Sequence, residues 1–261
     1  MHHHDDITVF RIKKINKNVS KMRNLKLLFI ALLCVATVTS AEAQFNKRVT
    51  GNGDVQKEKR ETKDFTGIRT SSGIDVYLSQ GSSNSVTVEA DQNLLEYIVT
   101  EVDGNTLRIY PDDVNIRRAE RMRVYVTMVT VESLRTSSAG DIIGETPVNA
   151  GSLKISTSSS GDVKLEVYAD ELFLKTSSAG DITLKGTASY VEATTSSAGD
   201  IKASALEVAE ADLSASSAGD IKITVTERLR ARASSAGDIH FYGNPPYVDA
   251  RSSSGGDVVR K

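Results

Sequence analysis

The chain has 261 residues, with 32 Lys and Arg against 34 Asp and Glu, a formal charge of −2 at neutral pH. This balance argues against nucleic acid as a partner, which attracts strongly basic chains. The single cysteine, Cys34, cannot form an internal disulfide, and the absence of tryptophan weakens the case for a sugar-stacking site.

The N-terminal segment has the pattern of an export signal within residues 22–43. A basic start is followed by the apolar run Leu27–Val38 and by the small-x-small cleavage site Ala41-Glu42-Ala43. The apolar run is too short to cross a bilayer, which takes roughly 20 residues. We therefore expect residues 1–43 to be removed and the rest to be exported to the periplasm, the outer envelope or the extracellular space, without a transmembrane segment.

The expected mature chain is acidic and free of cysteine. Removal of the leader takes away seven basic and three acidic residues, which leaves 25 against 31 and a formal charge of −6. We expect residues 44–64 to form an N-terminal extension and residues 65–261 to form a single domain. Within that domain, 65–135 is irregular and 136–261 is regular.

The irregular part alternates apolar and polar residues as strands do, at 85–90, 106–110 and 123–129. Between the first two, the segment from Asp91 to Val102 is amphipathic and predicts one short helix, with Asp91 capping its start. We expect this helix to close one end of the domain, where unpaired strand backbone would otherwise recruit other chains.

The regular part repeats one phrase seven times, SSAGDI or a close variant, at a spacing that hardly varies. A fixed period of about 20 residues indicates one structural unit stacked on copies of itself. The aspartates that mark the copies are Asp141, Asp162, Asp181, Asp200, Asp220, Asp238 and Asp257.

Residues at even distances from the glycine of each phrase are apolar or small, which is the period of strands with one buried face. In the copy around Gly180 these are Leu172, Leu174, Thr176, Ser178 and Ile182. Strands that pair with the next copy predict an all-β, parallel β-solenoid (a right-handed β-helix) with rungs of about 19–20 residues and a short helix in its N-terminal part.

The same alternation divides the serines of each phrase into an inward and an outward group. We expect those two before the glycine to be buried and to hydrogen bond between rungs, namely Ser138, Ser159, Ser178, Ser197, Ser217, Ser235 and Ser254. We expect those three before it to face outward, namely Ser158, Ser177, Ser196, Ser216, Ser234 and Ser253. The outward serines and aspartates would then form a polar ribbon along the solenoid.

Length differences between copies fall in three segments, 144–151, 185–189 and 243–247. We expect these segments to be loops, where specificity usually lies. At the C-terminal end, Asp257, Arg260 and Lys261 supply charge alone, which leaves the solenoid ends available for pairing in a homo-oligomer.

Three blocks in this order, FTGIRTSSGIDVYLSQG, VTVEADQNLLEYIVTEVDGNTLRIY and RVYVTMVTVESLRTSSAGD, resemble the family described as putative auto-transporter adhesin, head GIN domain. The resemblance covers roughly Phe65 to Val258. It implies an exported β-solenoid of Bacteroidetes with a cell-surface or adhesive role. The GIN triplet of the family stands here as Gly73-Ile74-Asp75, which adds a carboxylate.

Stacking in register would place the seven aspartates in a column about 29 Å long, where neighbouring charges repel by about 0.9 kcal/mol in water. Two interpretations remain open. Each carboxylate accepts hydrogen bonds from its own turn, in an Asx turn in which glycine supplies backbone freedom. Alternatively, the column binds divalent cations or a cationic partner, since hard oxygen ligands suit such ions.

The sequence favours a binding protein over an enzyme. After removal of the leader one histidine remains, His240, so no nucleophile, base and orienting group are apparent, and no cofactor or metal-ligand motif occurs. We expect an exported, non-enzymatic protein that offers a binding or adhesive surface to an unidentified ligand such as a glycan or a protein. The alternatives are a purely structural envelope component and a carbohydrate-active β-helix enzyme.

Overall fold

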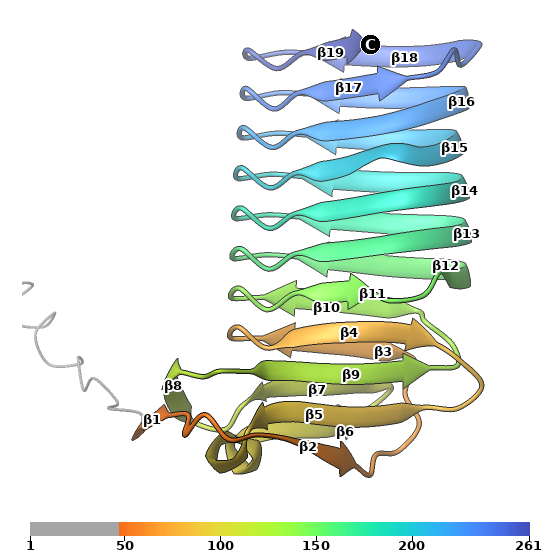
Figure 1. Ribbon diagram of the computed structural model, residues 1–261. Helices are drawn as coiled ribbons and strands as arrows, with labels where there is room; N and C mark the ends of the chain where they lie inside the picture. Colours follow the sequence, from red (N-terminus) through yellow and green to blue (C-terminus); the bar gives the residue numbers. More distant parts are fainter. Residues whose placement is uncertain (1–46) are drawn as a thin grey trace, which may run out of the picture. The chain divides into compact units, whose positions relative to one another are not determined.

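The computed structural model describes residues 47–261, so the expected signal peptide lies outside the described residues. These residues form one unit of stacked parallel coils, a β-solenoid of about seven turns with coils about 19 residues apart (Figure 1). The all-β solenoid predicted from the sequence is thus confirmed.

Each coil contributes to two sheet faces that enclose one apolar core. Each regular coil contains one tight turn, at the repeated SSAGD phrase. The leading face consists of the strand segments that follow these tight turns, and the trailing face consists of the segments that precede them. Long strands supply both faces because they bend midway. In one such strand the buried residues Val163, Leu165 and Val167 lie on one face, and the buried residues Leu172, Leu174 and Thr176 lie on the other. The strands of the regular part are β10 (Ser133–Ser137), β11 (Ile142–Gly144), β12 (Val148–Thr157), β13 (Val163–Thr176), β14 (Ile182–Thr195), β15 (Ile201–Ala215), β16 (Ile221–Ala233), β17 (Ile239–Tyr242), β18 (Tyr247–Ser252) and β19 (Val258–Arg260).

One of the three expected loops is strand. Residues 185–189 lie within β14 and pair in register with β13 as the chain bends from one face to the other. Gly186 permits the bend, because its φ of 123° is unfavourable for other residues and a Cβ there would collide with the carbonyl oxygen of Val167. Residues 145–147 and 243–246 do connect strands as loops.

The expected burial of the serines two before the glycine is wrong. Ser178 and the following Ala179 both adopt left-handed backbone conformations, with φ of 54° and 60°, so the alternation stops at the turn and both side chains face solvent. The other serines at this position are likewise exposed, namely Ser138, Ser159, Ser197, Ser217, Ser235 and Ser254. The preceding serines are half-buried, except for exposed Ser253, and are Ser158, Ser177, Ser196, Ser216 and Ser234.

The N-terminal end is closed by strands that continue both faces. The strands of this part are β1 (Lys47–Thr50), β2 (Val55–Arg60), β3 (Gly67–Ser71), β4 (Asp75–Gln80), β5 (Ser85–Asp91), β6 (Ile98–Asp103), β7 (Thr106–Pro111), β8 (Val114–Arg118) and β9 (Met122–Met128). On the leading face the order is β2, β5, β9, β4, β11, and on the trailing face β6, β7, β3, β10, β12. The outermost strand of the leading face, β2, belongs to the segment expected as an extension and carries the charged run Lys57 to Arg60, which discourages pairing with other chains.

The helix expected over 91–102 is wrong in its extent and its cap. Only Gln92–Tyr97 is helical, as a 3-10 helix, and Ile98 begins β6. Asp91 makes no side-chain capping bond to this helix. It is buried instead and accepts hydrogen bonds from the backbone N–H groups of Gly53 and Glu120, which attach the neighbouring loops. The helix still contributes Leu94 and Leu95 to the core at this end.

Candidate binding surface

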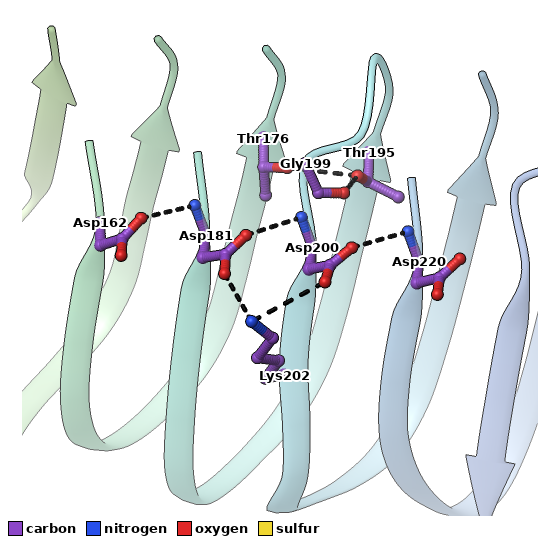
Figure 2. A network of polar contacts seen from close by, with 8 residues as sticks. All are labelled: Asp162, Thr176, Asp181, Thr195, Gly199, Asp200, Lys202 and Asp220. Carbon is purple, nitrogen blue, oxygen red and sulfur yellow. Dashed lines mark hydrogen bonds and ion pairs between the residues drawn. The ribbon is translucent and has the colours of Figure 1, made fainter. Parts of the chain in front are cut away.

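The seven aspartates predicted to form a column do so, at the start of the leading face. Figure 2 shows four of them, Asp162, Asp181, Asp200 and Asp220. Each carboxylate from Asp141 to Asp238 accepts a hydrogen bond from the backbone N–H of the aspartate in the next coil. The six bonds range from 3.0 to 3.3 Å and run without a gap from Asp141 to Asp257. The expected bonds to each residue's own turn are therefore replaced by bonds between coils.

The turn explains why these N–H groups are available. After the two left-handed residues the chain re-enters the sheet at the isoleucine or valine that follows each aspartate, as when the N–H of Ile182 donates to the carbonyl oxygen of Asp200 at 2.9 Å. The N–H of the aspartate itself points along the stack toward the previous coil, where the carboxylate meets it. Each aspartate thus joins its coil to both neighbours.

The column has an eighth carboxylate and basic groups beside it. Asp75 of β4 precedes Asp141 in the stack, and Arg123 of β9 is in register with Asp75 at the N-terminal end. In the middle, the Nζ of Lys202 bonds to Asp181 and lies 3.7 Å from a carboxylate oxygen of Asp200 (Figure 2). The sequence indicates this place for Asp75, because residues 71–76, SSGIDV, are an imperfect copy of the repeated phrase.

Charge repulsion persists along the column despite these basic groups. Burial raises the pKa of Asp162 above its usual value, and repulsion from Asp141 and Asp181 adds to this, while the N–H of Asp181 and the amine of Lys202 oppose it. The pKa of Asp75 is raised in the same way, first by burial and then by Asp141. A carboxyl whose pKa is higher in the folded than in the unfolded chain stabilises the fold below its unfolded pKa, and this contribution is lost as the pH rises through the folded value.

We therefore expect Asp162→Asn to increase the free energy of unfolding at pH 7 by up to about 1 kcal/mol, because the amide oxygen still accepts the N–H of Asp181 while the repelled charge is gone. The gain should vanish near pH 3, where the wild-type carboxyl is protonated. Denaturant unfolding at both pH values measures it. Asp181→Asn is the matched control and should show no gain, because it loses the bond to Lys202. A loss of stability in Asp162→Asn at pH 7 would contradict this account.

A second column, of basic side chains, lies on the trailing face. Its residues precede the tight turns, whereas the aspartates follow them. In the regular coils the basic column occupies the position five before each glycine, and it runs in register through nine strands, from β7 to β18. Six of the nine residues are basic, three are Ser or Thr, and none is acidic: Arg108, Arg69, Arg135, Ser156, Lys175, Thr194, Ser214, Arg232 and Arg251. The repeated phrase does not predict this column, because two members precede the regular repeats.

The surface of residues 47–261 carries several grooves, of which three border the two faces described above. One of about 600 Å³ crosses the leading face and includes Lys164, Lys185 and Lys202 in its lining. A second of about 710 Å³ follows the bend between the faces and includes the exposed Tyr168. A third of about 630 Å³ lies on the trailing face where the irregular and regular parts meet, and Arg135 contributes to its lining. The loop 145–147 contributes to the lining of the first groove.

Within residues 47–261, the surface features described above are charged columns and grooves. His240 is half-buried, and its Nδ1 has no hydrogen-bond partner within the described residues. Within residues 47–261 no three Asp, Glu, His or Cys side chains are placed to hold one metal ion. The same residues contain no helix of the length and apolarity needed to cross a membrane.

Comparison with known proteins gives one family and several structures of the same fold. Residues 64–245 match the family described as "Putative auto-transporter adhesin, head GIN domain". A putative adhesin from Bacteroides fragilis is 21% identical, with a TM-score of 0.78 over 82% of this chain and 100% of that one. A putative adhesin from Parabacteroides merdae is 20% identical, with a TM-score of 0.67 over 82% of this chain and 99% of that one. No curated protein matches the chain.

A third structure, described as a putative lipid binding protein from Parabacteroides distasonis, is 26% identical, with a TM-score of 0.67 over 82% of this chain and 100% of that one. The family match spans well over half of the sequence and includes both the irregular strands and most of the regular coils. The resemblance noted from the three sequence blocks is therefore confirmed, and the chain belongs to the family of putative auto-transporter adhesins with a head GIN domain.

Proposed function

We propose that this protein is an exported, non-enzymatic adhesin that presents a binding surface at the cell envelope. The observation that carries the proposal is the placement of outward side chains in straight columns, one acidic and one basic, on two faces of a filled solenoid. Side chains held at one spacing of about 4.8 Å suit a long or repetitive ligand, which can be contacted by many coils at once. The adhesin family and the adhesin structures of the same fold support this role.

We assign the aspartate column first to joining the coils. One oxygen of each carboxylate from Asp141 to Asp238 already accepts a backbone N–H, which is a sufficient reason for an aspartate in every copy. The other oxygens could bind cations only in addition to this role. A rise in thermal stability with Ca²⁺ or Mg²⁺ that is lost in an Asp200→Asn, Asp220→Asn variant would show that they do.

Export and adhesion are tested together. In the bacterium that naturally produces it, the protein should be found outside the cytoplasm with Gln44 as its first residue, as N-terminal sequencing would show. Beads coated with the purified protein should bind host-cell or bacterial surfaces more than beads coated with a similarly acidic protein. Retention of the protein in the cytoplasm, or equal binding by both kinds of bead, would reject the proposal. Shortening of glycans during incubation would instead favour the enzyme alternative.

A further inference from the structure

One part of the basic column, together with a lysine beside it, carries charge that the protein does not neutralise. Arg69 of β3, Arg135 of β10, Lys154 of β12 and Lys175 of β13 are exposed neighbours on the trailing face. We call these four residues the basic patch. None of them forms an ion pair with a carboxylate of residues 47–261.

The two ends of the same column differ from the patch. Arg232 and Arg251 both approach Asp249, at 3.9 and 3.4 Å, so the chain supplies an acid there. At the N-terminal end of the column, Arg108 pairs with Glu101 and Asp103. An acidic protein therefore balances the cations at both ends of the column and leaves those of the basic patch free, which points to an anionic partner at the patch.

A groove of about 630 Å³ adjoins the patch, and Arg135 and Lys154 belong to its lining. The remaining lining is rich in amides and hydroxyls, including Asn105, Asn149 and Ser152. Its one acidic residue, Glu132, accepts a hydrogen bond from the hydroxyl of Thr66 at 2.8 Å. Groups of this kind both donate and accept hydrogen bonds, as the hydroxyl groups of a sugar require.

An aromatic ring completes the site. Phe173 lies directly beside Lys154 in the register of β12 and β13 and is half-buried, with its side chain on the outer surface of the trailing face. An outward phenylalanine contributes little to the core, but it offers an apolar surface to a ligand. The basic patch supplies cations that bind carboxylate or sulfate groups, the adjoining groove supplies polar groups that bind hydroxyls, and Phe173 supplies a flat apolar ring.

We propose that the basic patch and its groove bind an acidic polysaccharide, a glycan chain with repeated carboxylate or sulfate groups, which lies along the solenoid axis. This inference rests on the proposed adhesive function and names its ligand class and its site. Cations on β3, β10, β12 and β13 recur from coil to coil, so a polymer along the axis meets several of them in succession. Such contacts are additive along a chain and weaken with salt.

The test measures binding of the purified full chain to immobilised heparin and polygalacturonate, with dextran as the neutral polymer. We expect binding to one or both acidic polymers, none to dextran, and a steep loss between low and physiological salt. In Arg69→Glu, Arg135→Glu, Lys154→Glu the dissociation constant should rise about tenfold or more. Arg232→Glu, Arg251→Glu is the matched control in the same column, and its effect should be several-fold smaller. All five side chains are exposed, so circular dichroism should show both variants folded.

Three results would overturn the inference. They are no binding to either acidic polymer, equal losses in the two variants, and a change from oligomer to monomer in the triple variant, which would assign the patch to a second copy of the chain. The bead assay separates this inference from the adhesive function. If the triple variant adheres to cells as the wild type does, the acidic-glycan site is wrong and adhesion stands; if the wild type itself fails to adhere, adhesion is wrong whatever the polymers show.

Discussion

Gly180→Ala is expected to lower the free energy of unfolding by about 2–4 kcal/mol, although it adds a single methyl group. A Cβ at Gly180 would lie 2.9 Å from the carbonyl oxygen of Gly161 and 2.9 Å from the backbone nitrogen of Ser158 in the preceding coil. Both atoms belong to backbone that is itself fixed by the stack, so neither can move aside. Denaturant unfolding monitored by circular dichroism measures the loss.

The matched control is Gly151→Ala, on the bend between the two faces. A Cβ there has nothing nearer than a carboxylate oxygen of Asp170 at 3.9 Å, so we expect a change within about 0.5 kcal/mol. Equal stabilities of the two variants would mean that the coils can separate at the turn, and would contradict the close contact. A loss confined to Gly180→Ala would identify space, rather than backbone freedom, as the reason for glycine in every copy.

The turn shows where the sequence was informative and where it was not. The nearly constant period of the repeats and the alternation before each turn were enough to predict the stacked coils and their buried residues, such as Leu172 and Leu174. The same alternation carried through the turn gave the wrong side for Ser178. Left-handed backbone is expected of glycine, yet here Ser178 and Ala179 adopt it while Gly180 does not. Propensity alone does not reveal such an exchange of roles.

The prediction of a helix over residues 91–102 was wrong for a different reason. Leu94, Leu95 and Ile98 have the spacing of an apolar helix face, and all three are buried. Ile98, however, is the first residue of β6, which pairs antiparallel with β7 and extends the trailing face. Edge pairing with an existing sheet outweighs weak helical propensity over a few residues. The role of this segment at the end of the solenoid was predictable, whereas its conformation was not.

The two charged columns were unequally predictable. The aspartates share one motif, so equal spacing implied one column, which the register confirms. Their hydrogen bonds to the next coil depend on the direction of the aspartate backbone N–H after the tight turn, and the spacing of the motif in the sequence does not reveal this direction. The basic column depends on the pairing of β3 with β7 and β10, which brings together Arg108, Arg69 and Arg135 from distant parts of the sequence. Only the folded register aligns them.

Buried threonines form an inner column just before the turns, at Thr70, Thr136, Thr157, Thr176 and Thr195. Their hydroxyl groups are not equally satisfied. Thr195 donates to the carbonyl oxygen of Gly199 and lies 3.2 Å from the hydroxyl oxygen of Thr176 (Figure 2). The buried hydroxyl of Thr157 has no hydrogen-bond partner within the described residues. A buried polar group without a partner costs free energy, whereas a bonded one contributes to stability.

Thr195→Val and Thr157→Val should therefore change stability differently, although the substitution is the same. Thr195→Val leaves the carbonyl of Gly199 and the hydroxyl of Thr176 without this partner, so we expect a loss of about 1–2 kcal/mol. Thr157→Val removes an unpaired hydroxyl and should leave stability unchanged or slightly raised. The two variants control for each other because both are buried in the same column of the stack. Chemical denaturation measures both, and equal losses would show that the hydroxyl of Thr157 is bonded in solution and contributes as Thr195 does.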